Sequence, residues 1–235
     1  MFQLNPIVDG LIKAFWLLSS FDPEVYHVMF LTMKISGTAV IIGTLLGIPI
    51  GATVALREFT GKRSLISIVN TLMGLPPVVV GLFVYLVLST SGPLGPLQLL
   101  YTPTAMIIAQ LIMALPLVIG VTVSTVGSVD KAIRDKAVSL GATRVQLMFT
   151  TLREARLGLL TAVIVAFGAA ISEVGAVMIV GGNIRWATRV LTTAIVFETE
   201  LGEFGVAIAL GLILLLLSFI INVILTHMQW MGVRK

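Results

Sequence analysis

The chain alternates between long apolar runs and short polar stretches, and the apolar runs set its architecture. Residues 64–129 contain no Asp, Glu, Lys or Arg, and a helix that spans a bilayer needs about 20 mostly apolar residues. The pattern predicts an all-α, polytopic transmembrane helical bundle with five spans, at residues 26–56, 65–89, 104–126, 157–180 and 204–226.

The N-terminal 24 residues hold a further apolar run around Trp16. The run is shorter than a span requires, and a tryptophan within it is typical of a helix that lies in the headgroup interface. Two interpretations stay open, an interfacial helix or a sixth, short span. A signal peptide is less favoured, because Ser19-Ser20 does not form a small-x-small cleavage site.

Composition agrees with a membrane protein. Hydrophobic residues make up 57% of the chain and charged residues 11%, whereas soluble domains average about 25% charged residues. There is no cysteine, which excludes disulfides and thiolate metal sites. No composition change marks a linker, so the prediction is a single transmembrane domain over residues 1–235.

Basic residues predict the orientation in the cytoplasmic membrane. Cytoplasmic loops of membrane proteins carry an excess of Lys and Arg. Three basic residues fall on the side of the first and last polar loops (Lys13, Arg185, Arg189), and eleven fall on the opposite side. The N-terminus is therefore expected outside and the C-terminus inside, and the eleven are Arg57, Lys62, Arg63, Lys131, Arg134, Lys136, Arg144, Arg153, Arg156, Arg234 and Lys235.

Prolines interrupt two of the predicted spans. The second span contains Gly74-Leu75-Pro76-Pro77 and the third contains Leu115-Pro116. Proline removes a helix hydrogen bond, so both spans are expected to be kinked or broken. Non-helical backbone at membrane depth occurs where it is buried or lines a wet cavity. Pro76 and Pro77 are thus candidates to line a pathway, or they only bend packed helices.

The largest polar island, residues 128–156, predicts two short helices joined at a glycine. Gly141 can take the left-handed conformation that ends a helix. Thr143 with Gln146 three residues later can form a capping box that starts the next helix. The predicted product is a rigid projection outside the membrane.

This island resembles the cytoplasmic loop of ABC importer permeases, whose signature is Glu-Ala-Ala, three residues, Gly, nine residues, then Ile-x-Leu-Pro. Asp135, Lys136 and Ala137 stand at the Glu-Ala-Ala positions, and Gly141 has the matching spacing. The end of the signature departs, because Thr151, Arg153 and Glu154 replace Ile, Leu and Pro.

The resemblance implies the type I ABC importer permease fold, with a cytoplasmic coupling helix that seats in a cleft of a separate ATP-binding subunit. It places the coupling contact on Asp135, Ala137, Gly141, Ala142, Thr143 and Arg144.

Three further stretches resemble oxyanion permeases of the molybdate, sulfate and tungstate group. Residues 70–81 are similar to the second-span motif of that group, and residues 91–95, 181–183 and 188–195 are similar to its tungstate branch. The resemblance implies a permease that imports tungstate by alternating access at a homodimer interface. The implied partners are a second copy, two ATP-binding subunits that use ATP and Mg, an extracytoplasmic oxyanion-binding protein and the lipid membrane. Molybdate and sulfate are the alternative substrates.

The loop after the fourth span offers candidate anion contacts. Gly181-Gly182-Asn183 could form a concave nest of backbone N–H groups, and such nests bind anions. Arg185 and Arg189 add positive charge, although Arg185 fits contact with a partner, water or headgroups better. The candidate pathway residues are Pro76, Pro77, Asn183, Thr188, Arg189 and Thr192.

Lys34 and Glu173 are each the only charge within their predicted spans. Both fall in the outer half of the membrane by the rise of 1.5 Å per residue, and pairing would lower the cost of burying them. They are a candidate intramembrane ion pair. The alternatives are a Lys34 side chain that extends to the headgroups and a protonated or hydroxyl-bonded Glu173.

No feature of the sequence points to catalysis. The chain has no Gly-x-x-x-x-Gly-Lys-Ser/Thr motif, which holds ATP phosphates in P-loop proteins. His27 and His227 belong to opposite membrane surfaces, so a metal site is not expected. The sequence predicts a transport subunit that is not an enzyme, binds no cofactor itself and has no nucleic-acid partner. An ion-coupled transporter or channel is disfavoured, because it needs more intramembrane titratable groups than this sequence has. A lipid-metabolising enzyme is disfavoured as well, because the sequence shows no cluster of polar catalytic residues.

Overall fold

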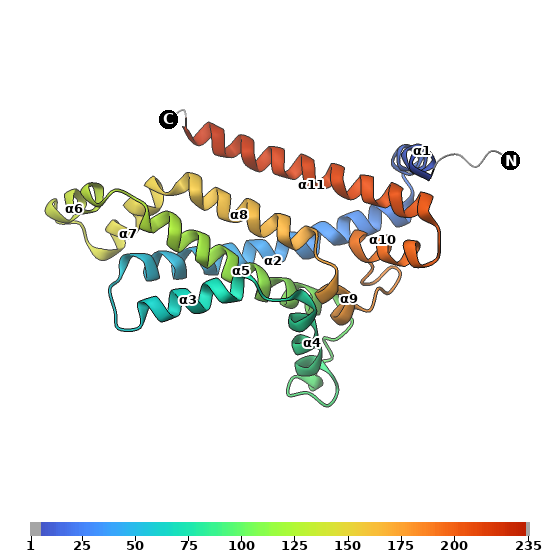
Figure 1. Cartoon of the computed structure of the whole chain (residues 1–235), viewed down its shortest axis with the longest axis horizontal. Coiled ribbons are helices and arrows are strands. Elements are labelled where there is room, and N and C mark those ends of the chain that lie inside the picture. Colours follow the sequence, from blue (N-terminus) through green and yellow to red (C-terminus); the bar gives the residue numbers. More distant parts are fainter. Residues whose placement is uncertain (1–5, 234–235) are drawn as a thin grey trace. The chain divides into compact units, whose positions relative to one another are not determined.

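The structure is a computed structural model that describes residues 6–233, and this part of the chain is all-α, as predicted (Figure 1). Its helices are α1 (Pro6–Ser19), α2 (Pro23–Leu56), α3 (Lys62–Met73), α4 (Pro77–Leu88), η1 (Gly95–Leu97), α5 (Pro103–Gly127), α6 (Lys131–Ser139), α7 (Arg144–Glu154), α8 (Arg156–Ile171), α9 (Gly175–Gly181), α10 (Leu191–Glu200) and α11 (Phe204–Val233).

Three of these helices, α2, α5 and α11, are long and apolar enough to cross a membrane. The number rises to five if each of two bent pairs, α3 with α4 and α7 with α8, counts as one span. Helix α1 has 14 residues, fewer than the roughly 20 that a span needs, so it does not form the sixth span. Arg234 and Lys235, on which the predicted side of the C-terminus partly rests, lie outside the described residues.

The prolines act differently in the two spans that contain them. Pro76 is the N-cap of α4 and Pro77 its first residue, where the missing N–H of proline is tolerated, so the second span is broken as predicted. Pro116 instead lies inside the continuous helix α5, as Pro49 lies inside α2. Of the two expected outcomes, a kink or a break, helix α5 is thus not broken at Pro116. The fourth span is also broken, because α8 ends before Glu173 and α9 begins after it.

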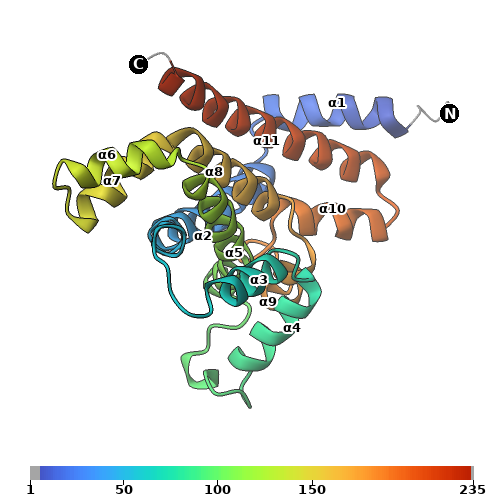
Figure 2. The same cartoon turned by 60° about the vertical axis from the view of Figure 1, so that its left-hand side comes forward.

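The chain divides into two compact units. The first comprises residues 1–39, 76–110 and 170–221, and the second comprises residues 40–75, 111–169 and 222–235. In the first unit, α1 lies against the start of α11, with Gly10 next to Ile208 and Gly205 next to Asp9 (Figure 2). The core of this unit joins α1, α2, α10 and α11 through Ala14, Val25, Val28, Leu191, Ala194, Ala209, Leu210 and Ile213.

Glycines bring helices together within each unit. In the first unit α4 packs on α9, where a Cβ on Gly81 would lie 2.8 Å from the Ala176 Cα. In the second unit Gly47 and Gly51 of α2 meet Val118 and Thr122 of α5, and a Cβ on either glycine would lie 2.7 Å from that neighbour's side chain. Small residues permit this close approach between helices in membranes.

Candidate functional site

The polar island folds into two helices joined at Gly141, which we call the α6–α7 hairpin (residues 130–156). Asp130 caps α6 by accepting a hydrogen bond of 2.9 Å from the Ala132 N–H. Helix α6 ends with two bonds of the Schellman type, from the Ala142 N–H to the Ala137 carbonyl (3.0 Å) and from the Gly141 N–H to the Val138 carbonyl (2.9 Å). Gly141 has a φ of +83°, so the predicted glycine corner is confirmed.

The predicted capping box starts α7. The Thr143 hydroxyl accepts a hydrogen bond from the Gln146 N–H at 3.3 Å, and the Gln146 side-chain oxygen accepts one from the Thr143 N–H at 2.8 Å. Each side chain satisfies one of the backbone donors that a helix start leaves without an intrahelical partner. Both ends of the corner are therefore fixed by local hydrogen bonds.

The hairpin is anchored through its second helix. Helix α7 bends into α8 by 71°, and Ala155 at the bend is buried with Ala52 of α2 and Val126 of α5. Met148 and Leu152 of α7 pack on the same cluster. A displacement of the hairpin would consequently be transmitted to α2, α5 and α8 of the second unit, because packed cores transmit strain.

The free side of the hairpin is apolar despite its charge. Leu140 is 79% exposed and Phe149 is 64% exposed, and exposed apolar patches rimmed by polar residues mark protein interaction sites. A shallow depression of about 500 Å³ opens between the helices. It is lined by Ile133, Lys136, Ala137, Leu140, Gly141, Ala142, Gln146 and Thr150.

The structure brings together three of the six predicted coupling residues, since Ala137, Gly141 and Ala142 line the depression. Asp135 and Arg144 are exposed beside it, and Thr143 serves as the helix cap. The sequence reasoning missed the apolar contributions of Ile133 and Leu140. Their presence as large aliphatic residues within a polar island is the signal that could have identified them.

The loop at residues 181–190 turns its polar side chains inward. The Thr188 hydroxyl, fully buried, donates to the Gly181 carbonyl (2.5 Å) and accepts from the Ile184 N–H (3.0 Å). The Ile184 carbonyl in turn accepts from the Thr188 and Arg189 N–H groups at 2.9 and 3.0 Å. Thr188 therefore closes the loop and has no free hydroxyl hydrogen for an anion.

The predicted backbone nest is not open to a ligand. The Gly182 N–H donates to the Met178 carbonyl at 2.9 Å, and the Ile184 N–H is bonded to Thr188. The ring of Tyr101 lies against Gly182. Asn183 stands in the left-handed region with a φ of +50°, and its side-chain oxygen is buried and has no hydrogen-bond partner within residues 6–233.

Two arginines of this loop are paired with the start of α2. Arg185 makes a two-pronged contact with Glu24, from its Nε to Oε1 at 2.9 Å and from Nη2 to Oε2. Its hydrogen bond to Glu24 raises the pKa of the Arg185 guanidinium above its ordinary value. Arg189 also reaches Glu24, at 3.4 Å, and its guanidinium lies 4.6 Å from the centre of the Phe197 ring.

These contacts change the interpretation of Arg189. Its side chain is only 13% exposed, and a neighbouring carboxylate and an aromatic face already stabilise its charge. The hydroxyl of Thr192 is also engaged within the protein, because it is buried and donates to the Glu173 carbonyl at 2.8 Å. Of the six predicted pathway residues, only Pro76 and Pro77 are exposed.

Lys34 and Glu173 do not form an ion pair. A Glu173 side-chain oxygen accepts a hydrogen bond of 3.0 Å from the Ala176 N–H in the first turn of α9, and Glu173 is 9% exposed. Lys34 is exposed and has no charged partner in the described residues. The predicted pair is replaced by a helix-start contact for Glu173 and by an outward-facing Lys34 whose long stem can reach the headgroups.

Apolar helices of spanning length, broken spans and an exposed helical hairpin are features of a helical membrane transport subunit. The family described as "Binding-protein-dependent transport system inner membrane component" matches residues 47–229, and the chain belongs to this family.

Individual relatives agree with the family. The chain is 45% identical over 223 residues to the tungstate uptake system permease protein TupB of Peptoclostridium acidaminophilum, covering 95% of this chain and 98% of the relative. It is 48% identical over 196 residues to a probable anion ABC transporter permease protein of Haloferax volcanii, covering 81% and 84%.

The fold is similar to that of a solved structure. A chain of a bacterial alginate ABC transporter, crystallised with a periplasmic protein that binds an alginate pentasaccharide, matches with a TM-score of 0.77. The match covers 97% of this chain and 88% of that chain at 19% identity, so it establishes the shared fold and not a shared substrate.

Proposed function

We propose that the chain is the permease subunit of an ATP-driven importer of tungstate in the cytoplasmic membrane. The single observation that carries the coupling part of this proposal is the exposed depression of the α6–α7 hairpin, lined by apolar and polar side chains, which contains three of the six predicted contact residues. The substrate is supported by the similarity to a tungstate uptake permease over almost the whole of both chains.

The proposed machine contains two copies of this chain, two ATP-binding subunits and an extracytoplasmic binding protein. The ATP-binding subunits bind ATP and Mg, and each seats one α6–α7 hairpin. Because the hairpin is fixed by caps at its corner and packed at its base, a movement of the ATP-binding subunit is passed on to the membrane helices. The hairpin lies on the cytoplasmic side, with the N-terminus outside and the C-terminus inside.

The experiment is substrate-stimulated ATPase activity of the complex reconstituted in proteoliposomes with its binding protein. Tungstate, molybdate and sulfate are compared, since all three are tetrahedral oxyanions of charge −2. Stimulation at the lowest concentration is expected for tungstate. A lower half-maximal concentration for molybdate or sulfate would overturn the substrate assignment, and purification without any ATP-binding subunit would overturn the coupling assignment.

A further inference from the structure

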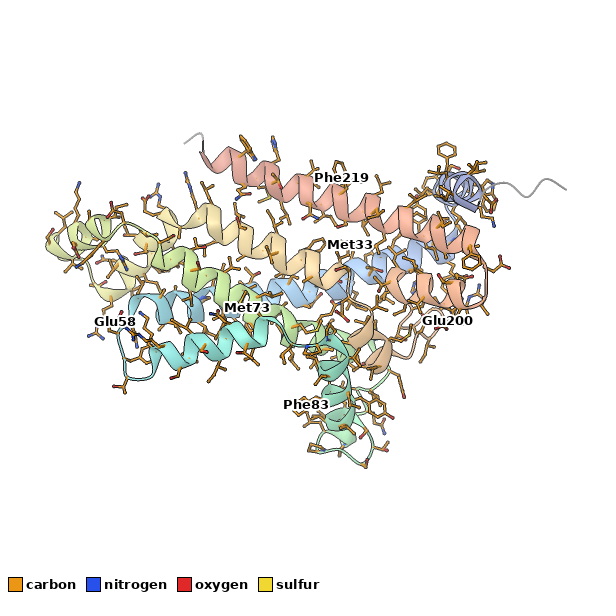
Figure 3. The ribbon with its side chains drawn as sticks, viewed as in Figure 1. Met33, Glu58, Met73, Phe83, Glu200 and Phe219 are labelled. Atoms are coloured by element: carbon orange, nitrogen blue, oxygen red, sulfur yellow. The ribbon has the colours of Figure 1, made fainter. Side chains whose placement is uncertain are left out.

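Helix α3 has three faces of different character. Its packed face consists of Ile66, Val69 and Met73: Val69 is 8% exposed, and Met73 (labelled in Figure 3) contacts Gly120 of α5. A second, exposed face is apolar and consists of Leu65, Ile68 and Leu72, of which Ile68 is 55% exposed.

The third face is exposed and polar. Residues three, four and seven apart share one side of a helix, and this spacing places Arg63, Ser64, Ser67, Asn70 and Thr71 on one stripe, all of them exposed. The stripe is about 12 Å long at 1.5 Å per residue. We call these five residues the polar face of α3.

The polar face has unused donors. The Thr71 hydroxyl donates to the Ser67 carbonyl at 2.9 Å, whereas the side chains of Ser64, Ser67 and Asn70 have no hydrogen-bond partner among the described residues. Arg63 likewise has no acidic partner in residues 6–233, since the nearby Glu58 is paired with Lys62 at 2.8 Å.

Lipid is an unfavourable environment for this face. Polar side chains in membrane helices point to the bundle interior or to a water-filled cavity. The apolar second face already provides α3 with a surface suited to lipid, so the polar face requires a different neighbour. A shallow depression of about 410 Å³, lined by Ser64, Ser67, Ile68, Thr71 and Leu72, runs along the boundary of the two faces.

The chemistry of the face fits an anion. Hydroxyl and amide groups donate hydrogen bonds, Arg63 adds a positive charge at one end, and residues 64–129 contain no acidic side chain that would repel an anion. Neutral donors in a row replace part of a hydration shell without trapping the ion, which conduction requires.

We propose that the polar face of α3 lines the aqueous route of the oxyanion. This inference rests on the proposed function and names the surface that the substrate meets. It assigns the route to residues other than Thr188, Arg189 and Thr192, whose polar groups are engaged within the protein.

Cysteine accessibility tests the proposal, because the chain has no native cysteine. Single variants Ser67→Cys, Asn70→Cys and Ile68→Cys are made in the complete importer in proteoliposomes. Each is treated with a negatively charged methanethiosulfonate, and labelling of this chain is followed by mass. Glu58→Cys, outside α3, controls for any effect of tungstate on the reagent.

Cysteines on the polar face should label faster than Ile68→Cys. A thiol in apolar surroundings has a raised pKa, and one pKa unit means roughly tenfold less reactive thiolate. Saturating tungstate should slow labelling of Ser67→Cys and Asn70→Cys and leave Glu58→Cys unchanged.

Two results would overturn the proposal. Equal rates for Ser67→Cys and Ile68→Cys would mean that the two faces share one environment. Fast labelling that tungstate does not slow would place the face in bulk water at the headgroups. If wild-type ATPase responds to tungstate in the same vesicles, these results refute the α3 route alone; an absent response to all three anions refutes the proposed function.

Discussion

The α6–α7 hairpin and the 181–190 loop are both polar interruptions of an apolar chain, yet their side chains serve opposite purposes. In the hairpin, backbone caps hold the corner and leave large apolar side chains exposed, such as Leu140 and Phe149. In the loop, Thr188 is fully buried and Arg189 nearly so, and both hold the loop together.

The difference shows what a polar residue in a membrane protein can be used for. The hairpin takes its hydrogen bonds from neighbours within five residues in sequence, so its side chains remain available for a partner. The loop must also be fixed to α2, more than 150 residues away in sequence, and Arg185 and Arg189 reach Glu24 across that separation. Charge in a loop is therefore evidence of a binding site only when its partners are known.

The largest expected effect is at the corner of the hairpin. Gly141→Pro is incompatible with a φ of +83° and removes the N–H that bonds to Val138, a loss on the order of 3 kcal/mol by analogy with proline inside a helix. Stimulated ATPase and co-purification of the ATP-binding subunit should both be lost, with normal insertion into the membrane.

Gly202→Pro is the matched control. Gly202 has a φ of +80° and donates its N–H to Thr199 at 3.1 Å, so the same chemical change is made in the turn before α11. Its variant should still co-purify with the ATP-binding subunit. Equal loss in both variants would show that the effect is general misfolding.

The hairpin could be predicted because its determinants are local. Gly141, Thr143 and Gln146 specify the corner and the cap within six residues of sequence, and the break at Pro76 follows from the missing proline N–H. At Pro116 the helix is not broken, because a helix such as α5 can remain continuous through a proline when its neighbours compensate for the lost hydrogen bond.

The loop could not be predicted because its determinants are distant. The sequence shows that Arg189 is basic and lies in a loop, but not that Glu24 and Phe197 stand beside it. Glu173 similarly carries a charge whose partner the hydropathy pattern does not identify, and its side chain accepts a hydrogen bond from the backbone N–H of Ala176. Such pairings depend on tertiary packing, which a hydropathy pattern does not encode.

A smaller but clear effect is expected at Thr188. Thr188→Val keeps the shape and removes the hydroxyl, so the Ile184 N–H and the Gly181 carbonyl each lose a partner. An unsatisfied buried group costs about 1–3 kcal/mol, and the melting temperature of the purified protein should fall. Thr188→Ser keeps the hydroxyl and should recover most of the loss; a loss of stability in Thr188→Ser without one in Thr188→Val would mean that the methyl group, and not the hydroxyl, holds the loop.

Arg189→Ala decides between a clamp and an anion contact. If Arg189 is a clamp to Glu24 and Phe197, the variant should lose roughly 1 kcal/mol of stability, with an unchanged half-maximal tungstate concentration for ATPase stimulation. Arg189→Lys keeps the charge and should be intermediate. A higher half-maximal tungstate concentration at unchanged stability would show that Arg189 contacts the anion. The loop and the hairpin would then no longer differ in this respect.

The smallest expected effect is the coupling between Lys34 and Glu173. Glu173→Gln keeps a side-chain oxygen that can accept from the Ala176 N–H, and Lys34→Met removes a charge that is exposed and has no partner in the described residues. Because the two side chains do not touch, the losses of stability in the single variants should add in the double variant to within about 0.3–0.5 kcal/mol. The measurement is thermal unfolding of the four proteins in one detergent. A double variant that recovers stability beyond that margin would show that the two charges meet in the membrane after all, and Glu173 would then have to leave the start of α9.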